Sequence, residues 1–226
     1  MSPSEYPYPD DLRPEMLPYV PIGAGRLLDV GCGRGGFGAA LKDRDPRLEV
    51  WGVETSASAC EIARERLDHV VHGRFPDALD EGTPRFGCVV FNDVLEHLEE
   101  PGDALARTHR LLDAGGVVVA SIPNVRDLRV VFPLVVLGRW EYSDIGLLDR
   151  THLRFFTRSS MLALFAGAGY RVERIDAINL GLSERLPAAS RRVERLLGRS
   201  LNAFRTPQYA IVARPDGTHP TVRPGP

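Results

Sequence analysis

Short apolar segments recur along this chain and alternate with segments whose apolar residues follow helical spacing. The apolar segments contain few polar side chains, which is typical of strands buried on both faces of a parallel sheet. Helices are predicted between the first five of them, at FGAALKDR, SASACEIARERL and GDALARTHRLL. The predicted strands are RLLDV (26–30), LEVWGVE (48–54), HVVHG (69–73), CVVFND (88–93), GVVVASIP (116–123), YRVERIDAI (170–178) and QYAIVARP (208–215).

This alternation predicts an α/β protein with a Rossmann-like, seven-stranded, mostly parallel sheet, helices on both faces and an antiparallel edge strand. Residues 183–204 can form a helix before the last strand, which is expected to run antiparallel at the edge. The predicted organisation is an N-terminal arm, a domain that carries an insertion between its fifth and sixth strands, and a disordered tail. Their ranges are 1–20 for the arm, 21–213 for the domain, 124–157 for the insertion and 214–226 for the tail.

The composition argues against several classes of function. The 226 residues are 43% hydrophobic and 26% charged, with a net charge of −2, which argues against a general nucleic-acid binder. There is no apolar run of about 18 residues, so no membrane span is expected, and the start of the chain lacks a signal-peptide pattern. We therefore expect a cytoplasmic protein. Cys32, Cys60 and Cys88 are too widely spaced for a zinc or disulfide pattern and are expected to be buried thiols.

A glycine-rich stretch, LLDVGCGRGGFGAAL (27–41), joins the first predicted strand to the first helix. A bare turn at the carboxyl end of a strand lets a nucleotide-like ligand approach the backbone. Glu54 ends the second strand, 21 positions after Gly33, where a carboxylate can accept hydrogen bonds from ribose hydroxyls. The same glycines also match the dinucleotide pattern G-x-G-x-x-G, and that spacing alone leaves the ligand open.

The run D-V-G-C-G-R-G, beginning at Asp29, resembles the first motif of class I S-adenosylmethionine-dependent methyltransferases. The segments FNDVLEHLEEPGDAL (91–105) and LLDAGGVVVASIPN (111–124) are similar to later parts of that superfamily, and the resemblance covers roughly residues 20–180. It implies S-adenosylmethionine as cofactor, whose positive charge suits an acidic residue beside the loop. The cofactor-binding residues implied are Asp29, Gly31, Cys32, Gly33, Glu54, Thr55, Phe75, Asn92 and Asp93.

One position departs from the family pattern. Family members commonly have an acidic or amide residue after the third strand, which binds the adenine amino group, whereas this chain has Arg74. Phe75 then becomes the candidate for stacking on adenine, and Asp77 a displaced acceptor.

The insertion is expected to shape the acceptor site. Its apolar piece VVFPLVVLG (130–138) is interpreted as a lid, as a contact between two copies of the chain, or as a helix packed on the sheet edge. The following stretch GRWEYSDIGLLDRTHLRFFT (138–157) resembles methyltransferases found beside glycosyltransferases in bacterial polysaccharide and natural-product pathways. A small-molecule or glycan acceptor, methylated at oxygen, is therefore expected.

Removal of a proton from a hydroxyl acceptor needs a base, and histidine titrates in a suitable range. His152 is the leading candidate, with Asp149 to orient it; the alternative is that both residues only hold the insertion in place. His97 is weighed between a catalytic role and a structural hydrogen bond. No compact ligand cluster stands out in the sequence, so no metal site is predicted.

Three functions remain open. A methyltransferase is favoured; a non-catalytic binding or regulatory protein of the same fold is the first alternative. A nicotinamide-dependent oxidoreductase is the second, and it lacks a convincing Tyr-Lys pair because Lys42 is the only lysine.

Overall fold

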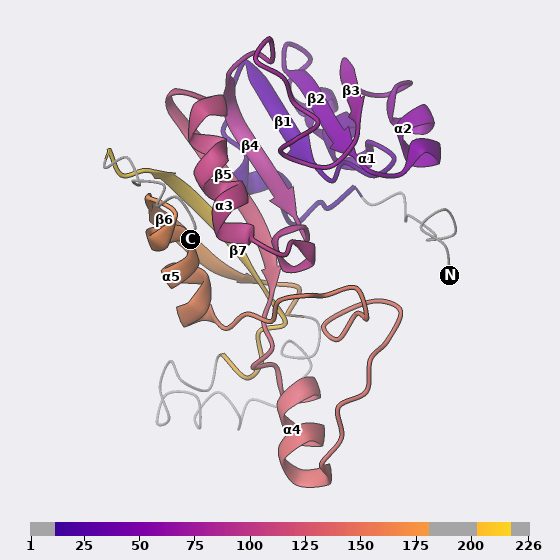
Figure 1. Ribbon diagram of the computed structural model, residues 1–226, viewed down its shortest axis with the longest axis vertical. Coiled ribbons are helices and arrows are strands. Elements are labelled where there is room, and N and C mark those ends of the chain that lie inside the picture. Colours follow the sequence, from indigo (N-terminus) through magenta and orange to yellow (C-terminus); the bar gives the residue numbers. More distant parts are fainter. Residues whose placement is uncertain (1–11, 181–202, 218–226) are drawn as a thin grey trace, which may run out of the picture.

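The computed structural model describes residues 12–180 and 203–217, in which seven strands form one sheet (Figure 1). The strands are β1 (Arg26–Val30), β2 (Glu49–Glu54), β3 (His69–His72), β4 (Phe86–Asn92), β5 (Leu112–Pro123), β6 (Tyr170–Ile178) and β7 (Gln208–Pro215). They lie in the order β3-β2-β1-β4-β5-β7-β6. β1 to β5 pair in parallel, and β7 pairs antiparallel with both β5 and β6. The predicted α/β fold is confirmed, and the last strand, β7, is antiparallel as expected. It does not lie at the edge, because it inserts between β5 and β6 and leaves β6 as the edge strand.

The helices are α1 (Gly36–Arg44), α2 (Ala57–Ala63), α3 (Pro101–Thr108), α4 (Leu128–Leu137) and α5 (Arg158–Gly167), with short 3₁₀ helices η2 (Leu17–Tyr19), η3 (Leu95–His97) and η4 (His109–Leu111). Helices α1, α2 and α3 lie in the three segments that apolar spacing predicts, whereas α5 was not predicted. The start of α2 is capped by Ser56, whose hydroxyl accepts the Ala59 N–H at 3.3 Å. A reciprocal capping box of Thr157 and Ser160 begins α5.

Alternate residues of the central strands enter two apolar clusters, one on each face of the sheet. Leu28 and Val89 point into the cluster that includes residues of α3 and α5. Their neighbours Leu27 and Val90 point into the cluster that includes residues of α1. Because β1 and β4 are buried on both faces, their carboxyl ends have fixed positions side by side, in the middle of the sheet.

The expected domain boundaries shift slightly. Met16 and Val20 lie within the predicted arm, but they are buried in one of the apolar clusters, at 0% and 3% exposure. At the other end β7 continues to Pro215, two residues past the expected boundary. Most of the helix considered for 183–204 lies outside the described residues. No helix of the described residues is long and apolar enough to cross a membrane.

The insertion at 124–157 contains α4 and a long return segment. In α4 only Val130 is buried, and the helix stands apart from the sheet at one end of the molecule (Figure 1). The interpretation of this piece as a helix packed on the sheet edge is therefore wrong for most of its length. The return segment runs back to the sheet, where the Val125 N–H donates to the Phe156 carbonyl at 2.8 Å.

Candidate active site

The glycine loop between β1 and α1 follows the backbone of the neighbouring strand. The N–H groups of Gly31 and Cys32 donate to the Val53 carbonyl of β2, at 2.8 and 3.2 Å. Gly31 has φ +71°, and a Cβ there would lie 2.7 Å from Cγ2 of Val94. Glycine is therefore required at Gly31 both for its backbone conformation and for the space beside Val94.

Glu54 ties this loop to the end of β2. Its Oε2 accepts the Gly33 N–H at 3.0 Å, and its Oε1 accepts the Ser56 N–H at 2.8 Å and the Thr55 hydroxyl at 3.2 Å. The side chain is 3% exposed. These contacts use three of the roughly four hydrogen bonds that a carboxylate can accept, so Glu54 shapes the loop around it. Of this group, Thr55 is the exposed residue.

Asp29 lies beside Glu54 at the end of β1. Burial, and then the charge of Glu54, raise the pKa of Asp29 to about 7. Cys32 is also buried, at 7% exposure, and burial raises the pKa of its thiol. Its sulfur would lie 2.5 Å from a Cβ at Gly52, so the Cys32 side chain fills space between β1 and β2. The loop therefore presents its backbone, with two buried acidic groups behind it.

The ends of β4 and β5 carry a second polar group. Asn92 has its side-chain oxygen and nitrogen buried without a hydrogen-bond partner in the described part of the chain. Asp93, with φ +52°, accepts the Ser121 hydroxyl at 2.9 Å and also contacts Gln208. The guanidinium of Arg13 contacts the same carboxylate and reaches the Ser121 hydroxyl at 3.2 Å. These residues form a charged and polar floor beside the glycine loop.

Phe75 is less available than the sequence analysis expects. Its ring packs edge-on against Phe91, with centroids 5.5 Å apart, and the residue is 6% exposed within the apolar core. Core packing accounts for Phe75 without a ligand, so its stacking on adenine remains a prediction. Asp77 is outside this core and pairs with Arg107 at 3.1 Å.

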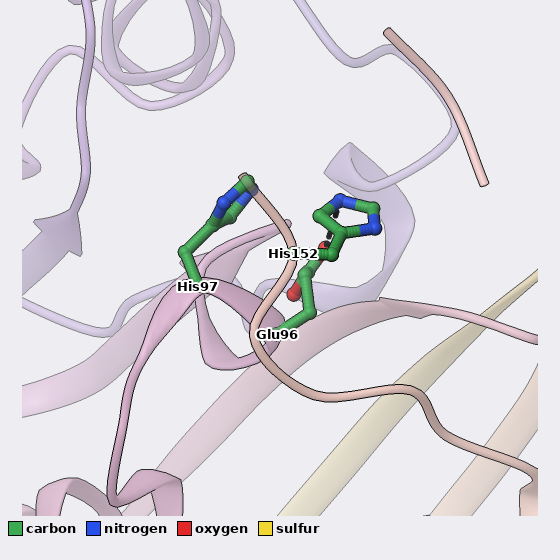
Figure 2. A group of neighbouring side chains, drawn as sticks. All are labelled: Glu96, His97 and His152. Carbon is green, nitrogen blue, oxygen red and sulfur yellow. Dashed lines mark ion pairs between the residues drawn. The ribbon is translucent and has the colours of Figure 1, made fainter. Parts of the chain in front are cut away.

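Three side chains meet where the return segment of the insertion crosses the end of β4. Glu96 and His97 belong to η3, and His152 belongs to the return segment (Figure 2). The Leu153 and Arg154 N–H groups donate to the Glu96 carbonyl at 2.9 and 3.0 Å, which fixes His152 beside η3. The two imidazole rings have centroids 4.7 Å apart.

Asp149 takes a structural position next to this group. It lies in a turn in which the His152 N–H donates to the Asp149 carbonyl at 3.0 Å. Its carboxylate accepts the Thr151 N–H at 2.8 Å and the Thr151 hydroxyl at 2.6 Å. Its charge favours protonation of His152, while burial, the larger effect, and His97 lower the pKa of that histidine. The turn, rather than a helix face, brings Asp149 and His152 near each other.

Two residues of this site, Arg13 and Glu96, are not among those predicted from the sequence. Arg13 lies in the predicted arm, and nothing in its local sequence indicates that it reaches the ends of β4, β5 and β7. Glu96 is 1% exposed and lies within 4.0 Å of His152. Its position inside the L-E-H-L run is the one available signal, since apolar residues surround it.

Comparison with known proteins agrees with this geometry. A family model described as a methyltransferase domain matches residues 5–175. A ubiquinone biosynthesis O-methyltransferase of Alkalilimnicola ehrlichii is 31% identical over 136 residues, 55% of this chain and 54% of the relative. A trans-aconitate 2-methyltransferase of Methylobacterium radiotolerans is 36% identical over 112 residues, 49% of this chain and 43% of the relative. This chain therefore matches about half the length of these curated relatives.

A solved structure of similar fold is described as a SAM-dependent methyltransferase from Archaeoglobus fulgidus. It has a TM-score of 0.61 and 20% identity, and the match covers 88% of this chain and 89% of that one. At that identity the likeness concerns the fold, and the family assignment rests on the match over residues 5–175. The chain belongs to the methyltransferase domain family, within the class I S-adenosylmethionine-dependent methyltransferases.

Proposed function

We propose that this protein transfers the methyl group of S-adenosylmethionine to an oxygen atom of a small-molecule acceptor. One observation carries the proposal: the glycine loop with Glu54 and the buried polar group at Glu96 lie at the carboxyl ends of neighbouring strands of one sheet. Ligands of open α/β sheets bind at that edge. A cofactor and an acceptor would thus meet across the end of β4.

In this proposal the cofactor lies along the ends of β1, β2 and β4. We assign Glu54, at the end of β2, to the ribose hydroxyls, and Asp29 to the positive charge of the methionine end. Asn92 supplies buried polar atoms that have no partner within the described structure. Thr55 and Phe75 are assigned to the adenosine end.

Aromatic side chains support the proposed acceptor side. The ring of Trp140 lies edge-on to those of Tyr142 and Phe155, with centroids 6.4 and 5.2 Å apart. Phe155 in turn contacts His152, at 6.2 Å between centroids. Tyr142 is 53% exposed. An exposed aromatic wall of this kind suits a sugar or another flat acceptor, and we include glycans and natural-product precursors among the candidates.

Methyl transfer is an in-line displacement, so the protein must align the acceptor oxygen and help to remove its proton. We assign that task to the group formed by Glu96, His97 and His152. Burial lowers the pKa of His152 and so favours its neutral form, which can accept a proton. Asp149 acts through the Thr151 turn that positions His97 and His152.

The proposal is tested by calorimetric titration with S-adenosylmethionine and, separately, NADH, followed by methyl transfer from radiolabelled cofactor to panels of phenols, sugars and carboxylic acids. Binding of S-adenosylmethionine with transfer to an oxygen supports it. Binding without turnover across the panels would favour the non-catalytic alternative. Binding of NADH alone would overturn the proposal.

The proposal also covers the location of the protein in the cell and its oligomeric state. The three cysteines Cys32, Cys60 and Cys88 are free and buried, which agrees with a cytoplasmic protein. The exposed apolar side chains of α4 support a homodimer contact at that helix.

A further inference from the structure

The carboxylate of Glu96 is buried without a hydrogen-bond partner among the described residues. The residue is 1% exposed, and no described residue donates a hydrogen bond to Oε1 or Oε2. Nε2 of His152 lies 4.0 Å from Oε1. A buried carboxylate without partners is costly, so such a group calls for a proton or a cation.

Two imidazoles face this carboxylate. One ligand atom from each of Glu96, His97 and His152 lies within 4.8 Å of the others. Figure 2 shows the two rings on either side of the glutamate in that view. Donor atoms on one Zn²⁺ ion lie roughly 3.4 Å apart, given metal–ligand distances of about 2.0–2.2 Å. Binding of an ion would therefore draw the three side chains together by about an ångström.

The hydrogen bonds of both histidines leave a nitrogen lone pair available. Nδ1 of His152 lies 3.3 Å from the Leu147 carbonyl, and Nδ1 of His97 lies 3.2 Å from the Thr151 carbonyl. A carbonyl oxygen only accepts, so each Nδ1 carries the proton and each Nε2 keeps its lone pair. Histidines that bind metals are commonly oriented by such an outer partner.

The surrounding charges also favour a cation. Burial, and then the charges of Asp93 and Asp149, raise the pKa of Glu96, while Arg13 opposes this shift. Burial and the neighbouring His97 both lower the pKa of His152, which favours the neutral imidazole that binds a metal. A divalent ion would offset the cost of burying the carboxylate, and both neutral imidazoles could bind the same ion.

We propose that Glu96, His97 and His152 bind a divalent transition-metal ion. Two imidazole nitrogens and one carboxylate oxygen form a donor set typical of Zn²⁺ and related first-row ions, and three protein ligands leave a coordination position open. The site departs from the expectation that the chain has no metal centre. The ion's role rests on the proposed function: in the open position it would bind the acceptor oxygen and lower the pKa of its hydroxyl.

The first test measures binding without relying on activity. Chelator-treated protein is titrated with Co²⁺ and followed by its visible absorption, and with Zn²⁺ by calorimetry. We expect one equivalent to bind, with at least a tenfold loss of affinity in Glu96→Gln and His152→Ala. The matched control is His69→Ala, because His69 stacks on Trp51 at β3 and belongs to no such group; it should bind the ion like the wild type.

A second measurement uses the unaltered protein, in case the variants fail to fold. In nitrogen-15 spectra of the histidine side chains, Zn²⁺ should shift the His97 and His152 signals and leave His69 unchanged. Absence of saturable binding, or shifts confined to other histidines, would overturn the metal site. S-adenosylmethionine binding and methyl transfer are measured in the same metal-free and metal-loaded samples. Transfer that persists without bound metal removes the ion's proposed role and leaves the methyltransferase proposal standing.

Discussion

The backbone N–H of Gly33 donates a 3.0 Å hydrogen bond to Oε2 of Glu54, which ties the glycine loop to the end of β2. The other oxygen of the same carboxylate accepts the Ser56 N–H at 2.8 Å. The residue that we assign to the ribose therefore also shapes the loop that the cofactor would contact. Changes at Glu54 should affect both tasks.

Replacement Glu54→Gln should weaken S-adenosylmethionine binding 10- to 100-fold, or about 1.5–3 kcal/mol. The glutamine amide has an NH₂ group in place of one carboxylate oxygen. This NH₂ group would face the N–H of either Gly33 or Ser56, so two donors would meet and one acceptor would be lost. The dissociation constant from calorimetry checks this. The control Glu61→Ala changes an exposed acidic residue of α2 and should bind like the wild type. Equal affinities of Glu54→Gln and wild type would remove Glu54 from the site.

Replacement Gly31→Ala should cost more stability than an alanine at another glycine with positive φ. Gly31 carries both the φ of +71° and the 2.7 Å approach to Val94, whereas Gly138 has φ +65° and open space. We expect a loss of about 1 kcal/mol for Gly138→Ala and about 2–4 kcal/mol for Gly31→Ala. Urea denaturation measures both. If the two losses are equal, contact with Val94 contributes nothing.

The raised pKa of Asp29 predicts a dependence of stability on pH. The native carboxyl, with a pKa of about 7, binds a proton that the unfolded chain releases near 3.8, so stability falls as pH rises between these values. From pH 5 to pH 8 the wild type should lose roughly 2–3 kcal/mol of unfolding free energy relative to Asp29→Asn. Denaturation curves at several pH values check this. Parallel pH profiles of the two proteins would contradict the burial of a titrating Asp29.

The exposed face of α4 predicts self-association. Val135 is 74% exposed, and a lysine there should shift a dimer toward monomer by light scattering without lowering the melting temperature. Ile22 is equally exposed, at 78%, but lies near β1, so Ile22→Lys should leave the oligomeric state unchanged. A wild type that is monomeric at every concentration would exclude the contact.

The sheet could be predicted because its central strands are continuous apolar runs. The ranges expected for β1, β6 and β7 match those observed, at 26–30, 170–178 and 208–215. Helix α2 is less regular: helical spacing continues to Leu67, but the helix ends at Ala63 and turn residues follow, with Leu67 still buried. Apolar spacing predicts which residues face the core and does not determine where a helix ends.

The two halves of the candidate site also differ in how far the sequence predicts them. The glycine loop and Glu54 end adjacent strands, so chain order alone predicts their proximity. Glu96 and His152 are far apart in the sequence and meet because the return segment donates two backbone hydrogen bonds to the Glu96 carbonyl. The path of that segment leaves no pattern in the sequence, and neither does the docking of Arg13.

Arg13 also links the site to the order in which the chain is made. Its guanidinium contacts Asp93 of the β4 end and reaches Oε1 of Gln208 at 3.5 Å, 195 residues later in the chain. At ordinary rates of synthesis, about 5–20 residues per second, those residues take roughly 10–40 s to appear. During that interval β5 has no β7 beside it, and the polar floor beside the glycine loop lacks its last member. A nascent chain can therefore complete this floor only after β7 has been synthesised.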